Sequence, residues 1–312
     1  MNKKLFFSIL FLLVLSLILS LSCVTKEVTE TSEFKDEIRI MTFNAHHAAP
    51  ESATFATLKD VQNIASFLNK NNIDICGLNE MDNEFDTKDS SRSSFVNQPK
   101  AITELTRSYY VFGSTLSTTG GKWIENTKYI ESGKWDFGIE SSDNKGNYGN
   151  AIISKFQILN MNNYGLPDLE SKEKRACLFA ETAVNNIIPF YIYVTHLADD
   201  SHIDRIQQIK SILGMIRKQK KLERTILMGD LNYDPEISKE KENFIQYIKD
   251  AGLKDASKFF PEKMNLKTYP ASNPNSRLDY IFISPDVQVS DYQVVDTGLS
   301  DHRAVIINIK LQ

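Results

Sequence analysis

Short apolar runs of strand length recur from Ile38 to the end of the chain, and helical patterns separate only some of them. In one helical pattern Leu58, Val61, Ala65 and Leu68 share a face, as the helical period requires. Because strands follow one another directly as well as alternating with helices, we expect mixed rather than purely parallel sheets. Strands are predicted over 38–43, 73–78, 109–112, 149–154, 178–184, 188–195, 225–228, 280–283, 288–294 and 304–309, and helices over 54–70, 101–106, 204–220 and 240–251.

The N-terminus predicts export. Lys3 and Lys4 precede an almost wholly apolar stretch over 5–21, which is typical of a secretory signal peptide over 1–22. A retained membrane helix is the alternative, since the stretch is at the lower edge of bilayer-spanning length. The following Ser20-Leu21-Ser22-Cys23 resembles a bacterial lipobox, in which the cysteine is lipidated and becomes the new N-terminus. We therefore expect a membrane-anchored lipoprotein of the cell envelope or surface, with a flexible tether over 23–37.

Charge and cysteine usage limit the function of the mature chain. Removal of residues 1–22 leaves 34 Lys and Arg against 40 Asp and Glu, which argues against a protein that coats nucleic acid through a broad basic surface. Cys76 and Cys177 lie in apolar runs, so two buried free thiols are favoured over a disulfide or a zinc site. Residues 38–312 have the length and the apolar content of one large domain.

A long polar stretch over 114–147 interrupts the strand pattern and contains Trp123 and Trp135. Loops of this length are usually functional or mobile. The two tryptophans are open to two interpretations, a functional contact or local packing.

Polar residues stand at the ends of six apolar strands. One such residue usually forms a cap or a turn, but turn chemistry alone does not explain the whole set. Strand ends are where a scaffold presents reactive groups. In chain order the residues are Asn44, Glu80, His196, Asp230 with Asn232, Asp279, and Asp301 with His302.

The residue types in this set suit a hard divalent cation and a phosphate. Mg²⁺ takes oxygen ligands from one or two carboxylates and keeps waters for substrate phosphates. The sequence contains no HExxH zinc motif, no P-loop and no Gly-x-Ser-x-Gly nucleophile motif. Phosphate-ester hydrolysis by an activated water is therefore favoured over acyl or glycosyl chemistry.

Seven segments resemble, in order, the successive blocks of the endonuclease/exonuclease/phosphatase family, and they extend over residues 38–310. They are Met41-Thr42-Phe43-Asn44-Ala45-His46-His47, Gly77-Leu78-Asn79-Glu80, Tyr148-Gly149-Asn150-Ala151-Ile152-Ile153-Ser154, Thr195-His196-Leu197, Gly229-Asp230-Leu231-Asn232, Arg277-Leu278-Asp279-Tyr280-Ile281 and Ser300-Asp301-His302-Arg303. The resemblance implies a four-layer α/β sandwich of the DNase I-like kind, with two packed mixed β-sheets flanked by helices.

The resemblance also implies roles for single residues. Glu80, Asn44 and Asp301 would form the site for Mg²⁺, with Mn²⁺ and Ca²⁺ as alternatives. The catalytic set would be Asp230 and Asn232 for the attacking water, His302 oriented by Asp279, and His196 on the phosphate. Asn150 and Arg175 would contact the phosphate or support the residues that do.

The sequence departs from the family pattern in two places. Nuclease members often pair the residue equivalent to His196 with a carboxylate just before the Asn150 strand, and residues 145–149 contain no acid. Asn79 stands where the family commonly has Gln. We interpret His46 and His47 primarily as residues that line the wall of the site, with metal ligation as the second possibility.

The sequence leaves the substrate open. A phosphodiester or phosphomonoester of nucleic acid, phospholipid or a small molecule fits the residues, and the missing acid argues mildly against a secreted nuclease. A non-catalytic binding lipoprotein on the same fold is the competing class, although a retired enzyme would usually have lost one member of the set. We expect a monomer.

Overall fold

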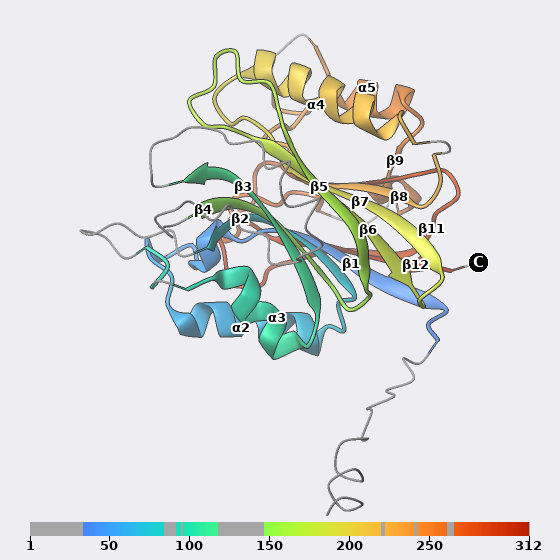
Figure 1. The fold of residues 1–312 in the computed structure, drawn as a ribbon. Coiled ribbons are helices and arrows are strands. Elements are labelled where there is room, and N and C mark those ends of the chain that lie inside the picture. The colour runs from blue at the N-terminus through green and yellow to red at the C-terminus, as the bar shows by residue number, and fades with distance from the viewer. Residues whose placement is uncertain are drawn as a thin grey trace, which may run out of the picture. The chain divides into compact units, whose positions relative to one another are not determined.

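Two six-stranded mixed β-sheets form the centre of the fold (Figure 1). The first sheet has the order β11-β12-β1-β2-β4-β3, and the second has the order β5-β6-β7-β8-β10-β9. The strands of the first sheet are β1 (Glu37–Asn44), β2 (Ile75–Asn83), β3 (Tyr109–Ser117), β4 (Asn147–Ser154), β11 (Gln288–Val295) and β12 (Ala304–Lys310). Those of the second are β5 (Ile158–Gly165), β6 (Ala176–Val184), β7 (Ile188–His196), β8 (Thr225–Asp230), β9 (Lys254–Asp255) and β10 (Asp279–Ile283).

The structure is a computed structural model that describes residues 34–83, 92–94, 96–117, 147–219, 222–239, 242–260 and 265–311. Lys35–Gln312 forms one unit by its internal contacts. The predicted signal peptide, Cys23 and most of the predicted tether lie outside the described residues. Within the described ranges no helix has both the length and the apolar character needed to cross a bilayer.

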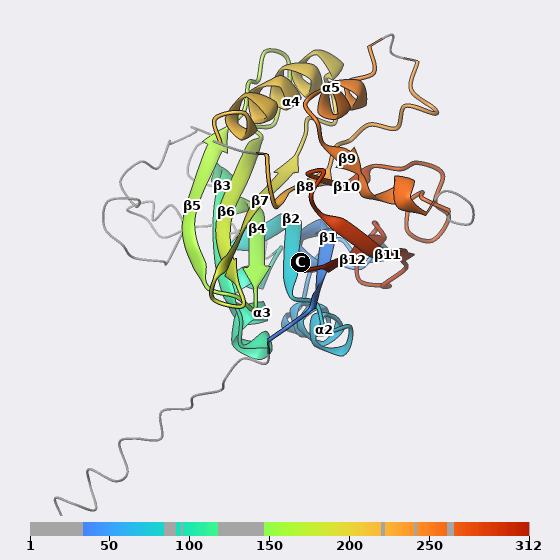
Figure 2. The same ribbon diagram turned by 90° about the vertical axis from the view of Figure 1, so that its right-hand side faces the viewer.

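Helices cover the outer faces of both sheets (Figures 1 and 2). Helices α2 (Leu58–Lys70) and α3 (Gln98–Thr106) lie on the first sheet, and α4 (His202–Ile216) and α5 (Ile245–Asp250) lie on the second. Two short 3-10 helices, η1 (His46–Ala48) and η2 (Ala256–Phe259), complete the described elements. The predicted four-layer sandwich of two mixed sheets is confirmed.

The alternation of strand side chains produces the layers. In β1, Ile40 packs between the two sheets, whereas its neighbour Met41 packs under the helices of the first sheet. The same division sends Ile226 and Leu227 of β8 to opposite faces of the second sheet. Both faces of the central strands are therefore buried, which explains why they read as continuous apolar runs.

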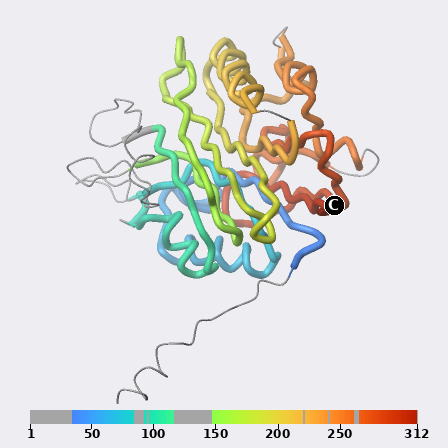
Figure 3. Tube along the Cα trace, turned by 45° about the vertical axis from the view of Figure 1, so that its right-hand side comes forward, coloured from blue at the N-terminus to red at the C-terminus, as the bar shows by residue number. Residues whose placement is uncertain are grey.

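The strands are paired so that distant parts of the chain meet. β1 is parallel to β2 and antiparallel to β12, so the first and last strands of the unit lie side by side (Figure 3). β7 is parallel to β8 and β10 is antiparallel to it. These pairings bring the ends of β1, β7 and β8 and the starts of β10 and β12 to one edge of the sandwich.

Several boundaries differ from the prediction. The helix expected over 54–70 begins at Leu58, because Thr57 caps it: Asp60 donates its N–H to Thr57 Oγ1 over 3.3 Å and accepts the Thr57 N–H at Oδ2 over 2.8 Å. The helix expected over 240–251 has only Ile245–Asp250, and Gly252 follows it with a left-handed φ of 94°. β5 was not predicted, because this edge strand carries three asparagines among its eight residues and masks the apolar period.

The interrupting segment is shorter than predicted. Residues 114–117 continue β3 and Asn147 begins β4, so only 118–146 separate the two strands. Trp123 and Trp135 lie outside the described residues. Cys76 and Cys177 are buried free thiols, as predicted.

Asn79 joins the two sheets in the interior. Its Nδ2 donates to Asn150 Oδ1 over 2.8 Å and to the Thr195 carbonyl over 3.0 Å, and its Oδ1 accepts the Asp230 N–H over 3.0 Å. Asn79 is 0% exposed, so no water replaces a lost partner. A buried donor or acceptor left without a partner costs about 1–3 kcal/mol.

We expect Asn79→Ala to lower the free energy of unfolding by about 3 kcal/mol, because it leaves the Asp230 N–H and the Thr195 carbonyl buried without their partner. Urea denaturation measures the change. The matched control is Asn69→Ala on the exposed side of α2, where Nδ2 makes one bond of 3.2 Å to the Leu105 carbonyl. Equal losses in the two variants would contradict the role assigned to Asn79.

Candidate active site

Polar side chains from both sheets meet at one edge of the sandwich. Asp230, the last residue of β8, lies opposite His196 in the parallel pairing with β7 and opposite Asp279 in the antiparallel pairing with β10. His302 precedes β12, and β12 pairs with the strand that ends at Asn44. The structure therefore gathers residues that are separated by more than two hundred positions in sequence.

A bulge in β2 places Glu80. The pairing of β2 with β4 shifts register between Leu78 and Met81, and Glu80 has a left-handed φ of 55°. A left-handed conformation is unfavourable for residues other than glycine, and such residues are frequent at functional sites. The bulge lets Asn79 enter the interior while the next residue, Glu80, lines a surface cleft.

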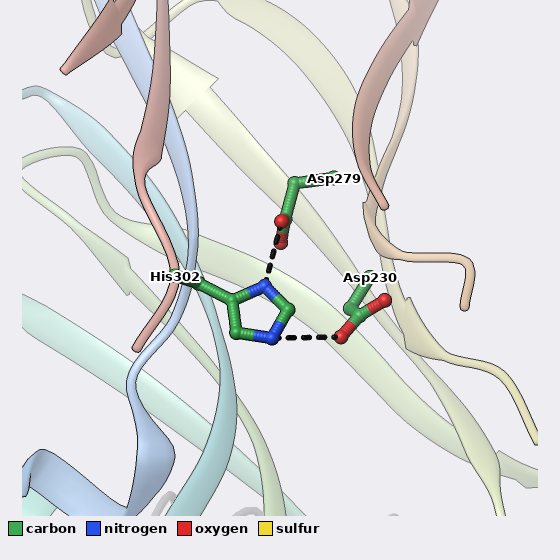
Figure 4. A group of neighbouring side chains, drawn as sticks. All are labelled: Asp230, Asp279 and His302. Carbon is green, nitrogen blue, oxygen red and sulfur yellow. Dashed lines mark hydrogen bonds and ion pairs between the residues drawn. The ribbon is translucent and has the colours of Figure 1, made fainter. Parts of the chain in front are cut away.

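His302 lies between two buried carboxylates (Figure 4). Its Nδ1 is 2.8 Å from Asp279 Oδ2, and its Nε2 is 3.7 Å from Asp230 Oδ2. Burial disfavours the charged imidazole, but the charges of Asp279 and Asp230 outweigh it and raise the pKa of His302 to about 10. The ring is therefore an imidazolium at neutral pH.

Asp230 is held on three sides. Its N–H donates to Asn79, its Oδ1 accepts the Asn232 N–H over 2.8 Å, and its Oδ2 accepts Asn44 Nδ2 over 2.9 Å. Gly229 precedes it with a φ of 139°, and a Cβ there would lie 1.9 Å from the Thr195 carbonyl oxygen. Only glycine permits this close approach of β8 to β7. Burial raises the pKa of Asp230 to about 7, although His302 opposes the rise.

Asn44, which the sequence predicts as a metal ligand, lies between two carboxylates. Its Nδ2 donates to Glu80 Oε1 and to Asp230 Oδ2, both over 2.9 Å, and its Oδ1 accepts the His46 N–H over 3.1 Å. The amide nitrogen therefore orients two carboxylates from different sheets. The amide oxygen keeps a second lone pair, so its role as a metal ligand stays a prediction.

His196 contacts a cation on one side of its ring and lies near an acid on the other, since its Nε2 is 3.6 Å from Asp230 Oδ2. Its Nδ1 is 2.9 Å from Arg175 Nη1, and its Nε2 is 2.9 Å from Asn232 Nδ2. A guanidinium only donates, so His196 Nδ1 is the acceptor. Burial, Arg175 and His302 together lower the pKa of His196 well below its usual value. His196 is thus a neutral ring, in contrast to His302.

The structure separates the two residues predicted near the phosphate. Arg175 lines the cleft beside His196. Asn150 is buried behind it, where Oδ1 accepts Asn79 Nδ2 over 2.8 Å and Nδ2 donates to the Ala176 carbonyl over 3.1 Å. Asn150 therefore lies at the joint between the sheets, which fits the second of its two predicted roles, and a contact with phosphate stays a prediction.

His46, His47 and Asp301 form the wall of the cleft on the side of η1. His46 Nδ1 is 3.9 Å from Asp301 Oδ1, and His47 Nε2 is 3.0 Å from the Thr54 carbonyl oxygen. Burial lowers the pKa of His47 to about 4. The positions agree with the interpretation of both histidines as wall residues.

The cleft has a volume of about 480 Å³. Sequence reasoning missed several residues that line it. Glu173 and Asp199 flank strands β6 and β7, where nearby polar residues gave a weak signal, whereas Arg92 and Tyr269 stand in loops with no strand pattern to mark them. The missed lining residues are Arg92, Tyr148, Glu173, Asp199, Tyr269 and Leu278.

Two sets of side chains could offer ligands to a cation. Among the described residues only Asp230, Asp279 and His302 form a close group, each with a ligand atom within 4.8 Å of the others. While His302 is protonated, its ring has no lone pair for a metal. Glu80, Asp230 and Asp301 offer carboxylate oxygens to the same cleft, and Asn44 already holds two of them together. Hard divalent cations such as Mg²⁺ fit this oxygen set.

Similar structures have the same fold. A structure of an endonuclease/exonuclease/phosphatase from Beutenbergia cavernae has a TM-score of 0.65 at 20% identity, covering 89% of this chain and 72% of that one. A mannosyl-6-phosphatase from Bacteroides thetaiotaomicron has a TM-score of 0.64 at 18% identity, covering 88% of this chain and 100% of that one. The human Nocturnin catalytic domain with a bound sulfate has a TM-score of 0.61 at 18% identity, covering 90% of this chain and 95% of that one.

No curated protein sequence matches the chain significantly. The model of the Endonuclease/Exonuclease/phosphatase family matches residues 41–302, which include every predicted site residue except Cys23. The chain therefore belongs to the endonuclease/exonuclease/phosphatase family.

Proposed function

We propose that this protein is a divalent-metal-dependent phosphoesterase that hydrolyses a phosphodiester or a phosphomonoester by attack of water. The observation that carries the proposal is the pair of opposite roles in one cleft: the imidazolium of His302, held by Asp279, and the carboxylate of Asp230 beside Glu80. The imidazolium stabilises negative charge on the phosphoryl oxygens as it develops. Asp230 orients the attacking water and accepts its proton.

Glu80 and Asp301 are the residues that would hold the metal ion, with Asp230 next to them. Mg²⁺ is the expected ion, with Mn²⁺ and Ca²⁺ as alternatives. When bound, it supplies positive charge that polarises the phosphoryl group. Asn44 keeps Glu80 and Asp230 in place, since its amide nitrogen donates to both.

The cleft favours a small phosphate ester over a nucleic acid, which is the second candidate substrate. His196 Nδ1 contacts Arg175, and residues 145–149 contain no acid of the kind common in nuclease members. Five carboxylates line the cleft, which weakens its attraction for a polyanionic strand. A mannosyl-6-phosphatase among the similar structures also supports a phosphate-ester substrate. A purely binding role is disfavoured, because it would not need the proton held between Asp279 and His302.

We further propose that the protein is exported, is lipidated at Cys23 and acts as a monomer at a membrane surface. The basic and apolar segment over 1–22 and the lipobox-like Ser20-Leu21-Ser22-Cys23 support this placement.

Residues 24–312 should cleave bis(p-nitrophenyl) phosphate with Mg²⁺ or Mn²⁺, and EDTA should remove the activity. We expect Asp230→Ala and His302→Ala each to lower the rate below detection, because one removes the base and the other the phosphate-stabilising charge. Release of p-nitrophenol measures the rate. Asp250→Ala at the exposed end of α5 is the control and should keep full activity. Activity that survives in both cleft variants would show that the site is assigned wrongly.

The pH profile should depend on Asp279. Activity needs Asp230 ionised and His302 protonated, so kcat/KM should rise as pH passes the pKa of Asp230 and fall as it passes that of His302, about 10. Asp279 raises the pKa of His302, so Asp279→Asn lowers it toward the ordinary value of about 6.5. The falling limb should therefore move to lower pH in Asp279→Asn. An unmoved alkaline limb would mean that His302 is not the group that must stay protonated.

Lipidation predicts where the full-length chain is found in a bacterial host. The wild-type protein should partition into the detergent phase of a membrane extract, and Cys23→Ala should lose this behaviour if residues 1–22 are still cleaved. Mass spectrometry of the N-terminus checks the processing. Residues 1–22 still attached to the wild-type protein would support the alternative of a retained membrane helix.

A further inference from the structure

One wall of the cleft extends away from the proposed reaction centre. Arg175 lies there between two acids: its Nη1 is 3.0 Å from Glu173 Oε1, and its Nη2 donates to Asp199 Oδ1 over 3.1 Å. All three side chains line the same cleft as Asp230 and His302. We define Glu173, Arg175 and Asp199 as the acid-arginine triad.

The triad still has capacity for hydrogen bonds. The side chains of Glu173 and Asp199 are 31% and 62% exposed, so each carboxylate has surface open to a ligand. Arg175 is 3% exposed and lines the cleft with both acids. The triad thus presents acceptors on both sides of a donor, at the edge of the reaction centre.

The charges of the triad select the kind of group that it binds. A second anion would meet Glu173 and Asp199 in addition to Glu80 and Asp301, all of which line the cleft. A cation would be attracted by the two acids but repelled by the guanidinium that lies between them. A neutral hydroxyl avoids both penalties, because it donates one hydrogen bond to a carboxylate and accepts others from a guanidinium.

Tyr269 adds an apolar face to the lining of the cleft. Its ring lies 4.8 Å from the ring of His302, and the residue is 37% exposed. Aromatic side chains contribute contact area with a fixed geometry, and a few polar groups fix the orientation of the ligand. A ring with carbon–hydrogen faces and hydroxyl edges matches Tyr269 and the triad together.

We propose that the acid-arginine triad binds the hydroxyl groups of a sugar-like leaving group, with Tyr269 against its carbon face. This rests on the proposed phosphoesterase function and names the substrate class as a sugar phosphate. Water attacks the phosphorus, the bond from phosphorus to the sugar oxygen breaks, and that oxygen gains a proton. The products are the free sugar and inorganic phosphate.

The experiment compares hexose 6-phosphate with n-hexyl phosphate in the presence of Mg²⁺. Both release a primary alcohol, but only the hexose has hydroxyls for the triad. We expect kcat/KM for the hexose ester to be at least about tenfold higher, as hydrogen bonds to charged groups imply. Glu173→Gln and Asp199→Asn should each reduce this ratio about tenfold, mainly through KM, since they replace a charged acceptor by a neutral one. Glu181→Gln, on β6 and outside the cleft lining, should retain the ratio.

Other outcomes overturn the proposal. Equal kcat/KM for the two esters, or an unchanged ratio in both triad variants, would exclude the sugar-binding role. Higher activity on phosphocholine than on hexose 6-phosphate would point to a cationic leaving group instead. Cleavage of bis(p-nitrophenyl) phosphate tests the phosphoesterase function separately from the sugar-binding role. If the enzyme cleaves this ester but does not prefer the hexose ester, the proposed function stands and only the sugar-binding role is excluded.

Discussion

The joint that Asn79 makes between the two sheets is the constraint on which the site depends. This buried amide forms hydrogen bonds with Asn150 of β4, with the carbonyl of Thr195 in β7 and with the backbone N–H of Asp230. The next residue of the chain is Glu80. The carboxylates of Glu80 and Asp230 belong to different sheets, so the packing of the two sheets sets the distance between them. Asn44 makes a second connection between the two sheets, since its side-chain amide donates to Glu80 and to Asp230. The cleft is therefore rigid where its chemistry needs fixed distances.

Neighbouring charges give the two buried histidines opposite charge states. His302 has carboxylates on both sides, so charge attraction exceeds the cost of burying a cation. His196 has the same kind of burial but contacts Arg175, which both opposes a positive charge and occupies Nδ1. Two imidazoles in one cleft thus have separate roles, one as a fixed charge and one as a neutral group, and their neighbours decide which is which.

The arginine beside His196 also connects the reaction centre to the rest of the cleft. Arg175 extends outward from His196 to Glu173 and Asp199, so a neighbour of the histidine also forms part of the cleft wall. Fold similarity at about 20% identity does not reveal such contacts, because different side chains fit on the same sheets.

The sequence by itself determined the class of fold and most of the site. Apolar runs on strands buried on both faces marked the sheets, and Glu80, Asp230, Asp279 and His302 stood out because polar groups at strand ends are visible in a linear pattern. Only the tertiary structure showed the hydrogen-bond partners of Asn44, Asn79 and Asn150, since an amide is the same in sequence whether it faces a cleft or an interior. It also decided that Arg175 is buried against His196 and that Tyr269 reaches His302. The physical reason is that hydrogen-bond partners and neighbouring charges come from strands and loops far apart in the chain, and only the packing of the two sheets brings them within reach.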